Sequence, residues 1–110
     1  VPHPLINVNI PCEITRPGKP GEEWETIAAD LFRLNETEAV IRIDTRLKHG
    51  DGNEINFNIS DFVIHSDIHV IGEKHISDLG TYYYNVKFTN ISDAAKKVIY
   101  TFLESTLFDV

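Results

Sequence analysis

The chain has 110 residues, of which 42% are hydrophobic and 25% are charged, and its formal net charge at pH 7 is −7. This length gives one domain with one hydrophobic core, and the composition is that of an ordinary soluble globular protein. The acidic balance is unfavourable for nonspecific binding to nucleic acid or to an anionic membrane, because both require a basic protein surface.

The sequence has no apolar run long enough to cross a bilayer and no signal peptide at its start. Cys12 is the only cysteine, which excludes an internal disulfide framework and a cysteine-based zinc site and favours a cytoplasmic location. The chain does not begin with Met. We therefore expect residues 1–110 to be a single domain taken from a longer protein.

The first part of the chain predicts two strands, because apolar and polar residues alternate along it. The first strand covers residues 5–14 and places its even-numbered side chains on one face, and Pro11 favours an edge or a bulge. The second strand covers residues 24–34, where Phe32 and Leu34 break the alternation.

Three more strands follow. The third covers residues 39–44, with its odd-numbered apolar side chains inward, and residues 49–52 (His-Gly-Asp-Gly) predict a turn. A fourth strand covers residues 55–59. The fifth strand is the longest, starts at Phe62 after a Ser-Asp turn, and has one apolar face: Phe62, Ile64, Ile68 and Val70.

The end of the chain predicts a closing strand and a helix. Residues 82–89 alternate between inward Tyr, Val and Phe and outward polar side chains. Ser92 is a good N-cap for a helix whose apolar stripe recurs at three- and four-residue steps. Six strands with short polar turns and one helix predict an all-β fold, a six-stranded antiparallel barrel with a C-terminal α-helix against it.

This pattern resembles the PilZ domain family, bacterial six-stranded barrels that bind cyclic di-GMP. The resemblance covers residues 5–108 and is closest from Tyr82 to Ser92, which is similar to the family's closing strand and turn. The family usually has Gly before the Val-x-Phe of this strand, where the present chain has Asn85.

The family holds its ligand with two motifs. One is Arg-x-x-x-Arg before the first strand, which clamps phosphate and stacks on guanine; it is absent here, and Val1 is similar to the point just after it. The other is Asp/Asn-x-Ser-x-x-Gly at the end of the second strand. Counting back from Gly50, the second motif falls on residues 33–38: Arg33 replaces Asp, Asn35 replaces Ser and Glu38 replaces Gly.

A shift of two residues would align Asn35 and Thr37 with the polar positions and Val40 with the Gly. In either alignment a side chain stands where the family has bare backbone. A Glu beside a dianionic ligand costs about 1 kcal/mol in a solvated site. The resemblance therefore implies a degenerate nucleotide-binding motif at Arg33, Asn35 and Glu38.

From the resemblance we expect a non-catalytic regulatory domain of bacterial cyclic di-GMP signalling that has no cofactor and acts through a protein partner. The first alternative is a true cyclic di-GMP receptor that uses arginines upstream of Val1. We expect no enzyme, because the sequence has no nucleophile turn, no phosphate-binding glycine loop and no metalloprotease helix.

The second alternative is a metal-binding barrel. His65, Asp67 and His69 project from one face of the fifth predicted strand, about 6.5–7 Å apart at each step, and could bind zinc or copper with help from a neighbouring strand. The simpler interpretation is an exposed polar face, and we predict no metal site.

Overall fold

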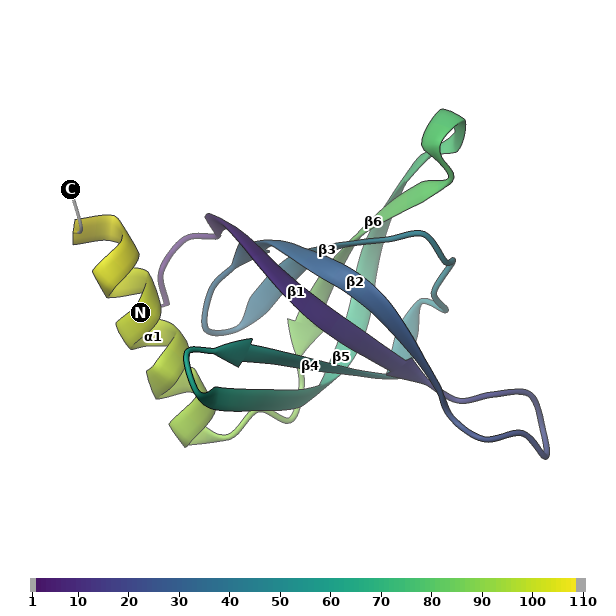
Figure 1. Cartoon of the computed structure of the whole chain (residues 1–110), viewed down its shortest axis with the longest axis horizontal. Coiled ribbons are helices and arrows are strands. Elements are labelled where there is room, and N and C mark those ends of the chain that lie inside the picture. The colour runs from purple at the N-terminus through teal and green to yellow at the C-terminus, as the bar shows by residue number, and fades with distance from the viewer. Residues whose placement is uncertain (1, 109–110) are drawn as a thin grey trace.

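The computed structural model describes residues 2–108, which form a closed antiparallel barrel and one long helix (Figure 1). Neighbouring strands follow the order β1-β2-β3-β6-β5-β4, and β4 closes the barrel by pairing with β1. The predicted six-stranded barrel with a C-terminal helix is therefore confirmed. The elements are β1 (Ile6–Arg16), β2 (Glu25–Leu34), β3 (Glu38–Ile43), β4 (Gly50–Ile59), β5 (Phe62–Ile76), the 3₁₀ helix η1 (Ser77–Leu79), β6 (Thr81–Phe88) and α1 (Asp93–Phe108).

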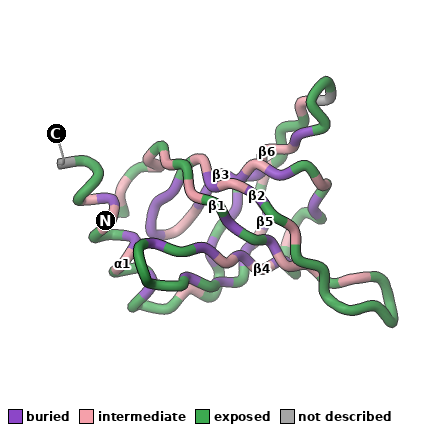
Figure 2. Tube along the Cα trace, in the orientation of Figure 1, coloured by how far each residue is buried: buried purple, intermediate pink, exposed green. Residues whose placement is uncertain are grey.

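The barrel interior is filled by the inward positions of all six strands, as the alternating pattern requires (Figure 2). Aliphatic and aromatic side chains make up this core, and each fully buried large one stabilises the fold by about 1.5–3 kcal/mol. The side chains with no more than 2% exposure include Ile14, Leu31, Leu34, Ala39, Ile41, Ile43, Ile55, Ile64, Ile68, Val70, Tyr84 and Val86. Phe62 is an exception to the predicted face: it is the first residue of β5 and is 38% exposed.

A bulge explains the irregular second strand. In the pairing of β2 with β3, Leu31 lies opposite Ile41 and Arg33 lies opposite Val40, so Phe32 is the extra residue. One added residue reverses the alternation, because side chains on a strand repeat every two residues. Leu31 and Leu34 are consequently both buried, and Phe32 points outward.

The turn predicted at residues 49–52 is wrong in its position. The chain connects β3 to β4 through residues 44–49, and Gly50 already pairs with Val70 of β5. Gly50 and Gly52 have φ angles of 85° and 113°, and the register shifts between Gly50 and Asn53. The glycines therefore allow a bulge inside the start of β4, because few other residues adopt a positive φ.

Helix α1 lies across one end of the barrel beside the N-terminal segment, while the β1–β2 and β5–β6 hairpins project at the other end (Figure 1). Its first turn is capped as predicted: the Ser92 hydroxyl accepts a hydrogen bond from the Ala95 N–H at 3.1 Å. Ala95, Ile99 and Leu103 are buried on its inner face. No helix in residues 2–108 has the length and apolar content needed to traverse a membrane.

Candidate functional site

The turn between β2 and β3, residues 35–37, is closed by the Asn35 N–H, which donates to the Glu38 carbonyl at 3.0 Å, and by the Asn35 side chain. The Asn35 Oδ1 accepts hydrogen bonds from the Thr37 N–H at 2.9 Å, the Thr37 hydroxyl at 3.1 Å and the Glu38 N–H at 2.8 Å. Such a side chain replaces a backbone acceptor and fixes a tight turn. Asn35 is only 5% exposed, so it organises the turn from inside.

The N-terminal segment lies on this turn. Asn35 Nδ2 donates to the His3 carbonyl at 2.8 Å, and the His3 N–H donates to Glu36 Oε2 at 2.9 Å. The other oxygen of Glu36 pairs with His3 Nδ1. Both the backbone and the ring of His3 are thus held by Asn35 and Glu36, consecutive residues of the turn.

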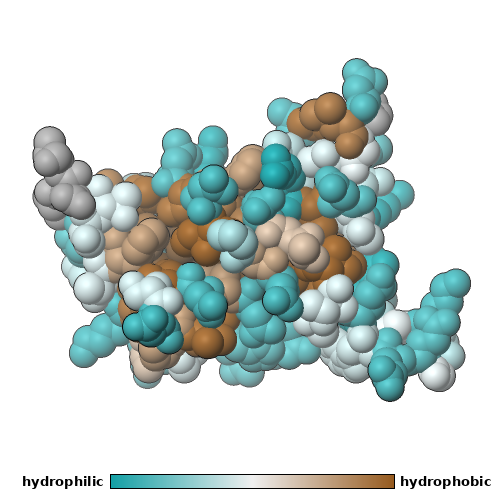
Figure 3. Space-filling view, in the orientation of Figure 1, coloured by the Kyte–Doolittle hydropathy of each residue, from teal (hydrophilic) through white to brown (hydrophobic). Residues whose placement is uncertain are grey.

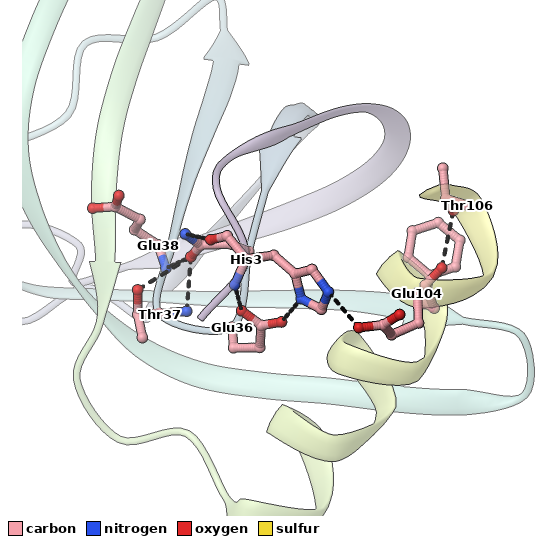
Figure 4. A network of polar contacts seen from close by, with 8 residues as sticks. His3, Glu36, Thr37, Glu38, Glu104 and Thr106 are labelled. Carbon is pink, nitrogen blue, oxygen red and sulfur yellow. Dashed lines mark hydrogen bonds and ion pairs between the residues drawn. The ribbon is translucent and has the colours of Figure 1, made fainter. Parts of the chain in front are cut away.

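Helix α1 completes the site from the opposite side (Figure 4). His3 Nε2 lies 2.9 Å from Glu104 Oε1, and the His3 ring centroid is 4.8 Å from that of Tyr100. The His3 side chain is 11% exposed and the Glu36 side chain 9%. Three segments that are distant in sequence, namely the N-terminus, the β2–β3 turn and α1, therefore meet at His3.

The electrostatics of this cluster follow from those contacts. The hydrogen bond to Glu36 raises the pKa of His3; burial opposes the shift, and the bond to Glu104 adds to it. Burial favours the neutral form of Glu36, but hydrogen bonds from His3 outweigh it and hold the pKa of this carboxyl below its ordinary value. The cluster therefore favours a cationic His3 between two anionic carboxylates.

The residues predicted as the degenerate motif lie at the end of β2 and the start of β3. Arg33 is exposed, Asn35 is buried and Glu38 is half-buried. Asn35 uses its Oδ1 for three turn hydrogen bonds and its Nδ2 for the His3 carbonyl. Arg33 therefore remains the one residue of the three that offers both exposure and positive charge.

Sequence reasoning missed His3, Glu36 and Glu104. His3 and Glu36 are separated by 33 residues, and His3 and Glu104 by 101. No local periodicity marks such contacts, since strand and helix patterns report only neighbours a few residues apart. The one local signal is the Pro-His-Pro run at residues 2–4, which fixes the backbone without indicating a partner.

A hollow elsewhere in the described chain has a volume of about 1140 Å³. The one cation lining it is Arg42, whose Nη2 lies 2.7 Å from Asp30 Oδ2 and whose guanidinium lies 5.0 Å from the centre of the Phe32 ring. Carboxylates of Glu13, Asp30 and Asp44 also line the hollow. An anionic ligand would meet more negative than positive charge there.

The three side chains considered as metal ligands have separate partners. His65 contacts Asn56 and Glu54, and His69 contacts Asp51. Asp67 Oδ2 accepts from Asn90 Nδ2 at 3.4 Å. Across residues 2–108, no group of three His, Cys, Asp or Glu side chains has an arrangement that could bind a metal ion. The alternation along β5 gives an exposed polar face here.

Comparison with solved structures decides the fold class. The chain is similar to the PilZ domain with c-di-GMP of YcgR from Escherichia coli, with a TM-score of 0.65 and 17% sequence identity over 92% of this chain and 83% of that one. The fold is that of a PilZ domain. No protein-family model and no curated protein matches the sequence. In this PilZ-like barrel, the residues that the sequence predicted as the second motif lie in and on both sides of the β2–β3 turn.

Proposed function

We propose that this chain is a non-catalytic, PilZ-like regulatory domain of bacterial cyclic di-GMP signalling, with a degenerate nucleotide site, that acts in the cytoplasm through protein contacts. The observation that carries the proposal is the occupation of the β2–β3 turn. Asn35 is engaged by the turn and by His3, and Glu36 by His3. Of the three motif residues, Asn35 is therefore already bonded within the chain, whereas Arg33 stays exposed.

The charge at the turn supports loss of the nucleotide. Cyclic di-GMP is a dianion, and Glu38 places a carboxylate at the position where the family has Gly. At a separation of about 4 Å, like charges repel by about 1 kcal/mol in a water-like medium and by more when partly buried. Arg33 can neutralise one negative charge of the ligand. A clamp on phosphate like that of the family's first motif would need a second arginine beside it.

Exposed apolar side chains support the part of the proposal that concerns protein contacts. Figure 3 shows mostly hydrophilic residues over the β1–β2 hairpin, whereas apolar ones lie at the tip of the β5–β6 hairpin and between β1 and α1. An exposed apolar patch larger than is usual on a monomeric soluble protein often marks a binding site for a partner. Among the residues whose side chains the structure describes, the large exposed apolar ones are Trp24, Phe62, Val63, Ile71, Leu79, Tyr100 and Leu107.

The test is a calorimetric titration of cyclic di-GMP into this chain and into a form extended upstream of Val1. We expect neither protein to release binding heat, because both contain the occupied turn and the Glu38 carboxylate. Binding by the chain itself would refute the degenerate site. Pull-down with a variant that carries charged residues at Phe62 and Val63 then tests for the protein partner.

One observation favours the alternative of a true receptor. The backbone of His3 is bonded to Asn35 and Glu36, so any residues upstream of it in a longer protein would start close to the turn. Binding by the extended form alone would establish this alternative. In that case Glu38→Gln should strengthen binding about fivefold, the equivalent of about 1 kcal/mol, whereas Glu22→Gln in the exposed β1–β2 loop should leave it unchanged.

A further inference from the structure

The geometry around His3 favours the protonated ring. Nδ1 faces one oxygen of Glu36, and Nε2 faces Glu104 Oε1 at 2.9 Å. A neutral imidazole has one N–H donor and one lone pair, and a lone pair cannot bond to a carboxylate oxygen. Only the imidazolium donates to both carboxylates at once.

Within residues 2–5, every hydrogen bond that involves a side chain is made by His3. Residues 2–5 precede β1 and belong to no strand. Pro2 and Pro4 have no backbone N–H to donate. The hydrogen bonds that fix this segment to the turn and to α1 involve the N–H, the carbonyl and both ring nitrogens of His3.

We propose that protonated His3 is a pH-controlled latch that holds the N-terminal segment across the β2–β3 turn and α1, and that loss of its proton releases the segment. The titratable groups that face the ring, within residues 2–108, are Glu36 from the turn and Tyr100 and Glu104 from α1. The site holds one positive and two negative charges when latched. Deprotonation leaves a neutral ring between two carboxylates, so the nitrogen that has lost its proton directs a lone pair at a carboxylate oxygen, which is repulsive.

The sign of the pH dependence follows from the directions of the two shifts. The pKa of His3 is raised above 6.5, so its contribution is complete below that pH and is lost as the pH rises through the higher, folded-state value. The pKa of Glu36 is lowered below 4.5, so its contribution is present above that pH and is lost on acidification through the folded-state value. The latch is closed between these limits.

Release would uncover the β2–β3 turn. Glu36 is 7% exposed and Asn35 5% exposed while His3 lies over them. The latch thereby links pH to access to the turn that holds the proposed degenerate nucleotide site. The inference itself requires no nucleotide, so its test is independent of the proposed function.

The experiment is an NMR titration of the intact chain between pH 4 and 10 that follows the imidazole ¹⁵N signals of His3 and the NOE contacts between the His3 and Tyr100 rings. We expect both nitrogens to remain protonated through pH 6.5, a midpoint above it, and loss of the ring contacts through the same midpoint. His3→Gln should remove that alkaline transition, because Gln does not titrate.

Two carboxylate variants complete the design. Glu104→Gln should lower the His3 midpoint, because it removes one of the two anionic partners. The matched control is Glu54→Gln, which removes the carboxylate 3.0 Å from the exposed His65 ring and should not move the His3 midpoint. A His3 that is neutral at pH 6.5, ring contacts that persist above the His3 midpoint, or an unchanged midpoint in Glu104→Gln would each overturn the latch.

Discussion

Substitution of Asn35 by Ala should destabilise the domain by about 2–3 kcal/mol. The variant removes the acceptor of the Thr37 and Glu38 backbone N–H groups and the donor to the His3 carbonyl. Each of these bonds contributes a net 0.5–1.5 kcal/mol or so, and a polar group left unpaired away from water costs about 1–3 kcal/mol. Because Asn35 is only 5% exposed, water replaces the lost partners incompletely.

The assay is urea unfolding followed by circular dichroism. With a slope of about 1–3 kcal/mol per molar urea for a small domain, the midpoint should fall by roughly 0.7–3 M, with the slope unchanged. Asn58→Ala is the matched control, because Asn58 is exposed on β4, and surface substitutions usually stay within about 0.5 kcal/mol. Asn35→Asp keeps the acceptor and loses the donor, so its midpoint should lie between those of Asn35→Ala and the native chain.

A midpoint for Asn35→Ala that matches the control would refute this reasoning. It would mean that the turn forms without its central side chain, and that Asn35 is available for contacts with a ligand. The stability of the variant therefore distinguishes a turn residue from a ligand residue at the same position.

Two further predictions concern buried groups of the barrel. Tyr84→Phe should reduce the free energy of unfolding by about 1–3 kcal/mol, because the hydroxyl accepts from the Leu47 N–H at 2.8 Å and donates to Glu73 at 2.7 Å. Scanning calorimetry should show a fall in melting temperature of roughly 4–13 °C. Tyr83→Phe, whose hydroxyl has no hydrogen-bond partner within residues 2–108, should melt like the native chain. Burial, with smaller contributions from Asp30 and Glu13, raises the pKa of Cys12 to about 12. At pH 8 only a fraction on the order of 10⁻⁴ of the native thiol is thiolate, so Cys12 should react with a disulfide reagent only after urea unfolds the domain. Rapid labelling of the native protein would contradict the buried position of Cys12 on β1.

The sequence by itself determined most of the barrel, because its information is local. A strand that packs one face on a core must alternate, and residues 82–89 and 39–43 do so without interruption. The Ser92 cap and the stripe through Ala95, Ile99 and Leu103 likewise need only the geometry of one helix. The resemblance to PilZ domains rested on the same local patterns and predicted the fold that the comparison with solved structures supports.

Irregular pairing was beyond the reach of these patterns. Phe32 and Leu34 contradicted an ideal strand, and only the register against β3 shows that Phe32 is an extra residue. Gly50 and Gly52 similarly predicted a turn, although the pairing with β5 makes them part of a bulge. A bulge belongs to two strands at once, so one strand's sequence does not define it.

Only the tertiary structure decided the cluster at His3. Its partners lie on a turn 33 residues away and on a helix 101 residues away, and they meet because α1 packs across the end of the barrel beside the N-terminus. The sequence alone does not indicate the charge of a histidine between two prolines. The carboxylates at its two ring nitrogens favour the cationic form, because electrostatic interactions depend on distance in space and not on separation along the chain.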